Sequence, residues 1–121
     1  MDKETAFYQL WSSFSIPAYD ENSVPKDADY PRIDYQVITD SFDSVVYPMA
    51  KLWYRSSSWE NIDQKKKEIA ARLADLAPIP LDDGYMHVTA GTPFAQRTAA
   101  ENDDTVKGYI LNLAVEFFTR I

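Results

Sequence analysis

Two segments of the chain have apolar side chains at the three- or four-residue spacing of a helix face, namely residues 2–14 and 58–77. Asp2 and Ser58 stand before them as possible N-caps, because their side-chain oxygens can accept hydrogen bonds from first-turn amides. Pro78 ends the second helix. The two apolar stripes are Ala6, Leu10, Trp11 and Phe14, and then Trp59, Ile62, Ile69, Ala70, Leu73 and Leu76.

Between the helices, apolar and polar residues alternate, which predicts strands over residues 33–38 and 45–56. Residues 40–44 form a polar turn between them, so we expect an antiparallel hairpin. Pro48 cannot donate a ladder hydrogen bond and therefore indicates a strand edge, a bulge or a late strand start.

The second half of the chain predicts a small hairpin and one long strand. Asp83-Gly84 between apolar runs indicates a tight turn within residues 79–88. Residues 107–119 alternate most clearly and predict a central strand. Residues 15–31, with three prolines, and residues 89–104 are expected to be irregular.

This order of elements predicts an α+β fold. We expect a two-layer sandwich, with a mostly antiparallel sheet of four to five strands and both helices on one face. A chain of 121 residues is the length of one domain, so residues 1–121 are expected to form a single domain.

Charge excludes some classes of partner. The chain has 12 basic and 19 acidic residues, a net charge of −7, which argues against nucleic-acid binding through phosphate and against anionic membranes. The N-terminal residues lack the apolar stretch of a signal peptide, so we expect synthesis in the cytoplasm.

Residues that carry chemistry are few. The chain has no cysteine, and its one histidine, His87, lies in a predicted strand without partners at metal-ligand spacing. Asp82-Asp83 and Asp103-Asp104 are better explained as a turn and a charged loop than as cation sites. We therefore predict no catalytic residue, no cofactor and no metal, and we expect that the protein is not an enzyme.

Aromatic residues are more informative, because they make up 14% of the chain and several fall outside the predicted core. Trp53 lies on the strand face opposite Leu52 and Tyr54, while Tyr30 and Phe94 lie in predicted loops. Such residues are typical of a surface that a partner covers. Trp11 is either a core residue, which its helical spacing favours, or an interface anchor. The candidate interface residues are Trp53, Tyr30, Phe94 and Trp11.

Five segments together resemble the tail terminator, or tail completion, proteins of long-tailed phages and prophages, in the manner of the minor tail protein U of lambda-like phages. They are residues 2–11 (DKETAFYQLW), 30–37 (YPRIDYQV), 52–59 (LWYRSSSW), 91–97 (GTPFAQR) and the strand at 110–118.

The resemblance implies a structural protein that forms a ring, typically a hexamer, on the finished tail tube. Such a ring ends tail growth and offers a surface to the head connector. Implied partners are further copies of the subunit, the tail tube protein and the head-connector protein, with the free subunit expected as a ring or a monomer. The location implied is the virion tail or neck, after synthesis in the bacterial host. DNA would pass an acidic lumen without specific binding, because like charges repel.

Two alternatives stay open on the sequence. One is another head–tail neck adaptor or a monomeric protein-binding module of a prophage. The other is a small enzyme or regulator whose acidic loop binds a metal.

Overall fold

The computed structural model describes residues 1–100 and 103–119. Over these residues the chain forms two helices and seven strands, so the predicted α+β class is confirmed. The helices are α1 (Lys3–Ser12) and α2 (Glu60–Ala74). The strands are β1 (Ala18–Asp20), β2 (Arg32–Tyr35), β3 (Val45–Val46), β4 (Met49–Arg55), β5 (Ile79–Leu81), β6 (Gly84–Ala100) and β7 (Asp103–Thr119).

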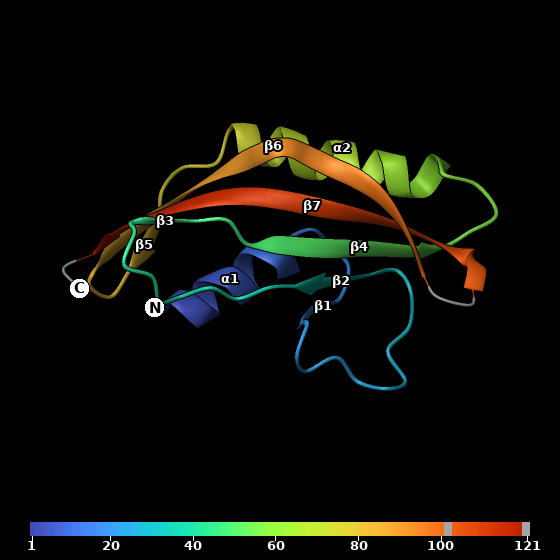
Figure 1. Cartoon of the computed structure of the whole chain (residues 1–121), viewed down its shortest axis with the longest axis horizontal. Coiled ribbons are helices and arrows are strands. Elements are labelled where there is room, and N and C mark those ends of the chain that lie inside the picture. The colour runs from blue at the N-terminus through green and yellow to red at the C-terminus, as the bar shows by residue number, and fades with distance from the viewer. Residues whose placement is uncertain (101–102, 120–121) are drawn as a thin grey trace.

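All seven described strands belong to one curved sheet in the order β1-β2-β4-β7-β6-β5, with β3 paired to β7 (Figure 1). The β1–β2 pair is parallel and the other pairs are antiparallel. The predicted sheet of four to five strands is therefore too small, and the sheet is mixed. The prediction missed β1 because this strand has only three residues, within a segment that three prolines made look like a loop.

The largest departure from prediction is β6, which continues through most of the segment expected to be irregular. β6 pairs with β7 from Gly84 to Ala100, and an irregularity between Ala90 and Ala95 accommodates Gly91 and Pro93. The segment lacks apolar alternation because its side chains are mostly small or polar and exposed. Pairing with the apolar β7 holds it in place instead, and β7 itself begins at Asp103 rather than near residue 107.

β3 and β4 act as one strand interrupted by Pro48. Val45 lies opposite Glu116 and Met49 opposite Asn112, so both strands keep a single register along β7. The amide of Leu113 donates to the carbonyl oxygen of Pro48 across the gap. The strand predicted over residues 45–56 is thus present, as β3 and β4, and it is interrupted at Pro48. The predicted antiparallel pairing is confirmed between β2 and β4, but the short turn over residues 40–44 is wrong, because residues 36–48 separate β2 from β4 and β3 within them pairs with β7.

Both helices pack on the same face of the sheet, as predicted. On β7, Tyr109 contacts Trp59 beside α2, while Phe117 contacts Phe7 of α1. These two β7 residues are an even number of positions apart and so point to one face. The buried side chains of both helices and of this sheet face form a single core cluster.

The ends of the helices follow the capping rules in part. The side chain of Asp2 caps α1 by accepting a hydrogen bond from the amide of Thr5, at 2.7 Å. The helix over residues 58–77 begins later than predicted, at Glu60, with Trp59 in the N-cap position. Ser58 Oγ accepts only a long hydrogen bond from the Glu60 amide, at 3.4 Å.

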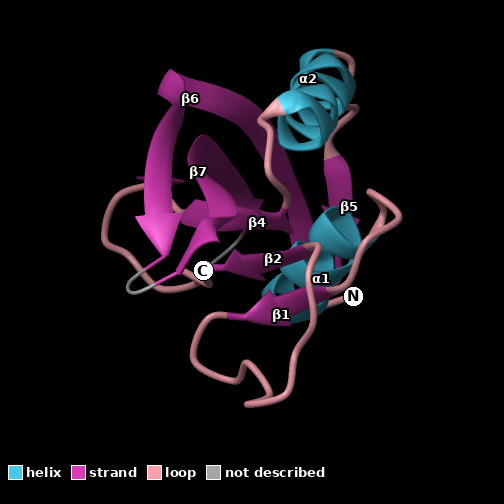
Figure 2. Ribbon diagram, turned by 90° about the vertical axis from the view of Figure 1, so that its right-hand side faces the viewer, coloured by secondary structure: helices cyan, strands magenta, loops and turns pink. Residues whose placement is uncertain are grey.

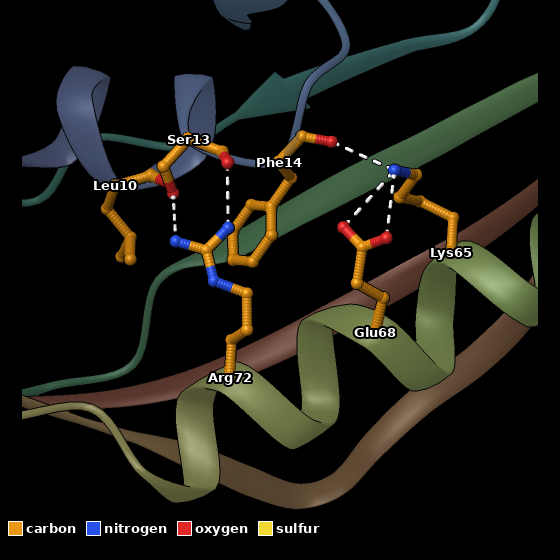
Figure 3. A network of polar contacts seen from close by, with 6 residues as sticks. All are labelled: Leu10, Ser13, Phe14, Lys65, Glu68 and Arg72. Carbon is orange, nitrogen blue, oxygen red and sulfur yellow. Dashed lines mark hydrogen bonds and ion pairs between the residues drawn. The ribbon is translucent and has the colours of Figure 1, made fainter.

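Basic side chains of α2 satisfy the carbonyl groups that follow α1 (Figure 3). Arg72 donates to the Ser13 carbonyl oxygen at 2.7 Å and to Ser13 Oγ at 3.1 Å, and its guanidinium lies over the Phe14 ring. Lys65 donates to the Phe14 carbonyl oxygen at 2.9 Å and pairs with Glu68. Because helix C-termini leave carbonyl groups without intrahelical partners, these contacts join α1 to α2 where α1 ends.

The small hairpin between β5 and β6 turns at Asp82–Asp83, one residue earlier than predicted. A Cβ atom on Gly84 would collide with the backbone of Phe118, which explains the glycine here. Among the described residues, neither helix has the length and apolar character needed to cross a membrane.

Candidate interaction surface

The face of the sheet that α1 and α2 leave uncovered is the strongest candidate for a functional surface. Along β4 and β7, one set of alternate residues is buried beneath the helices, including Leu52, Leu111 and Leu113. The other set points to the opposite face, which we call the outer face. No helix lies against it in the described part of the chain (Figure 2).

At the end where β3 lies, the outer face carries exposed large apolar side chains. Tyr85 and Phe118 lie opposite each other on β6 and β7 and stack, with ring centroids 4.8 Å apart and an angle of 16° between the rings. Tyr47 is 71% exposed and Met49 37% exposed, and by the register of β3 and β4 both lie across from β7. This group of four is termed the apolar row.

A second cluster, at the other end of the outer face, is centred on Trp53. The Trp53 ring lies directly over Gly108. A Cβ atom added to Gly108 would be 2.7 Å from Cε3 of this ring and closer still to Cζ3, so the position has room only for glycine. Tyr30 lies between two guanidinium groups, with Arg32 at 4.7 Å and Arg55 at 5.0 Å from its ring centroid. A recess of about 390 Å³ lies between these residues and the end of β6, and its lining is Tyr30, Arg32, Asp34, Lys51, Trp53, Thr98, Ala99 and Ala100.

Carboxylates balance much of the positive charge in the Trp53 cluster. Arg32 pairs with Asp34 at 3.0 Å, and Arg55 pairs with Asp103 at 2.9 Å. Hydrogen bonds from Thr105, and then from Arg55, lower the pKa of the Asp103 carboxyl, because they favour its ionised form. Lys51 has no ion pair among the described residues.

The structure brings together two of the four predicted interface residues, Trp53 and Tyr30. Phe94 is half-buried and packs against the core, away from the outer face. Trp11 is 1% exposed and packs against Phe14, so its interpretation as an interface anchor is wrong and its interpretation as a core residue is confirmed. The reason is its place in the apolar stripe of α1, which faces the sheet.

Sequence reasoning missed the apolar row and Phe42. Phe42 is fully exposed within residues 36–44, between β2 and β3. Phe42 could have been proposed from the sequence, because it is an aromatic residue inside a predicted polar turn. Tyr85 and Phe118 could not be paired from the sequence, because their stacking depends on the register of β6 against β7.

The acidic pairs do not form a metal centre in the part of the chain that the structure describes. No group of three or more His, Asp or Glu side chains lies there at metal-binding distance. Asp82 forms an ion pair with the N-terminal amino group, and His87 is exposed opposite Glu116.

No protein-family model matches the chain, and a search of curated proteins finds no similar sequence.

Proposed function

We propose that the protein is the subunit of a closed ring that caps the tail tube of a long-tailed phage, ends tail growth and receives the head connector. The observation that carries the proposal is the outer face, where the apolar row is exposed on a sheet without a covering helix. Exposed apolar groups of this kind are typical of surfaces that become buried on assembly. The resemblance of five segments to tail terminator proteins is the reason for proposing that this assembly is a ring on the tail tube.

Charge is consistent with this role. Each subunit has a net charge of −7, so a ring of six would be strongly acidic and would repel the phosphates of passing DNA. A closed ring uses head-to-tail contacts, in which two different surfaces of one subunit meet. The tube, the head connector and neighbouring subunits are the proposed partners, and the tail or neck of the virion is the proposed location.

Deleting the gene from the phage or prophage that encodes the protein tests the role. We expect tails of uncontrolled length that lack heads in electron micrographs, and a return to uniform length when the wild-type gene is supplied in trans. Tails of normal length that join heads after deletion would exclude the terminator role. Tails of normal length without heads would instead indicate a neck adaptor.

A further inference from the structure

The sheet has two open edges that differ in charge, since β6 has no acidic residue and the segment around β1 has several. On one margin, β5 pairs only with Gly84–Met86, and no described strand pairs with the outer side of β6 from His87 to Ala100. On the other margin, β2 is the one described strand that pairs with β1. Figure 2 shows β6 and β1 at opposite margins of the sheet. Unpaired strand edges present backbone donors and acceptors that another strand can use.

We propose that the β6 edge of one subunit pairs with the β1 edge of the next copy, so that the sheet continues from subunit to subunit around the ring. This inference deepens the proposed function, on which it rests, by assigning the contact between neighbouring copies. The contact segment on β6 is Ala95–Ala100, since the irregularity at Ala90–Ala95 breaks the edge before it.

Strand direction supports this pairing. β6, β7, β4 and β2 alternate in direction because each neighbouring pair is antiparallel, and β1 is parallel to β2. β1 therefore runs opposite to β6. Copies that keep one orientation about a ring axis would place β6 against an antiparallel β1, which is the more stable kind of pair.

The backbone of β1 is available for such a contact. The carbonyl oxygen of Pro17 and the amide of Glu21 bond to β2. Because alternate residues of a parallel strand bond to the same neighbour, Ala18 and Asp20 direct their amides to the open side. The Asp20 carbonyl oxygen already accepts from the Ser23 amide at 2.8 Å, so the groups offered are the two amides and the Ala18 carbonyl. The edge is short, so the side chains beside it must contribute to the choice of partner.

Charge favours a head-to-tail contact over pairing of two β1 edges. β6 contains no acidic residue in an acidic chain. Its charged side chain, Arg97, lies over the Trp59 ring and 4.0 Å from Asp63, so it is already paired within the subunit. Residues 18–31, at the β1 edge, contain four acidic residues, Asp20, Glu21, Asp27 and Asp29, and one basic residue, Lys26. In a β6–β1 contact the acidic edge meets an edge without carboxylates, whereas two β1 edges would bring like charges together.

Cross-linking tests the contact directly, because the chain has no cysteine of its own. The single variants Gln96→Cys and Glu21→Cys place thiols at exposed positions on the two edges. With a short bis-maleimide at high protein concentration, we expect a covalent dimer when the two variants are mixed and little product from either alone. The variant with both changes should give a ladder of oligomers. Gln96→Cys mixed with Lys67→Cys, on the exposed side of α2, is the matched control.

Charge exchange provides the second measurement. Changing Gln96 and Ala99 to Glu, or Glu21 and Asp27 to Lys, should weaken self-association about tenfold or more in sedimentation. Combining all four changes in one chain should restore it, since the two altered edges then carry complementary charges.

Three outcomes would overturn the inference: efficient cross-linking of Gln96→Cys to itself, no more product in the mixture than in the Lys67 control, or no rescue by the combined charge exchange. Normal tails after gene deletion, together with β6–β1 cross-links, would overturn the proposed function and leave the edge contact standing.

Discussion

At the scale of single residues, the Trp53 ring packs directly on Gly108. Adding a methyl group at residue 108 therefore tests this contact. We expect Gly108→Ala to cost about 1–3 kcal/mol of unfolding free energy, because the new methyl group displaces the Trp53 ring. In a Trp53→Ala background the same change should cost less, since the ring is gone and Thr98 Cγ2, 2.9 Å from the added carbon, remains as the close neighbour. Denaturant unfolding of the four proteins in this cycle measures the coupling, and equal costs in both backgrounds would contradict the contact.

Asp103 offers a test by pH. Hydrogen bonds from Thr105 and Arg55 lower the pKa of its carboxyl, so Asp103 should stay ionised as the pH falls through the usual range of an exposed aspartate. Its stabilising effect is present above the pKa of the unfolded chain and is lost as the pH falls through the lower pKa of the folded protein. Carboxyl-carbon NMR measures this pKa, and Thr105→Val should raise it toward the ordinary value. A titration unchanged by Thr105→Val would exclude the hydrogen bond as the cause.

At the scale of elements, the link between α1 and α2 depends on Arg72. Arg72→Met keeps an apolar stem over Phe14 but removes both hydrogen bonds to Ser13. We expect a loss of about 1–2 kcal/mol in thermal or denaturant unfolding, because a charge-assisted hydrogen bond is removed and a helix-end carbonyl loses its partner. Lys67→Met, at an exposed position of the same helix, is the control and should have little effect. Equal effects of the two changes would mean that α1 ends without help from α2.

The elements also show what periodicity can predict and what it cannot. Both helices and the strand around Leu113 were predictable because their apolar spacing reflects burial against one core. β6 was not, because most of its residues from Thr89 onward are exposed and their strand conformation comes from pairing with β7. Of the interface candidates, Trp53 and Tyr30 could be proposed from the sequence. The apolar row could not, because it joins Tyr47, between β3 and β4, to residues of β4, β6 and β7 through registers that only the fold defines.

At the scale of the whole molecule, different surfaces of the subunit are suited to different contacts. One sheet face holds the core and both helices, and the opposite face holds the apolar row and the Trp53 cluster. The β1 margin is acidic, whereas β6 has no acidic residue. A ring subunit needs such a division, since it must contact two neighbours and the tube without one contact blocking another. The proposed β6–β1 contact occupies the margins and leaves the outer face for the tube or the connector.

The outer face and the loop with Phe42 can therefore be tested apart from folding. Phe42→Ser and Tyr47→Ser remove side chains that are 110% and 71% exposed, so each should change the free energy of unfolding by less than about 0.5 kcal/mol. If these side chains anchor the ring on the tube, the double variant should fail to restore uniform tail length in the deletion strain, because truncating an aromatic anchor costs about 2 kcal/mol or more at an interface. Tyr8→Ser, which removes an exposed aromatic from α1 on the helix-covered side, is the matched control and should complement normally. Full complementation by the double variant would place the tube contact elsewhere on the subunit, and failure of the Tyr8 control would point to a general loss of solubility or expression.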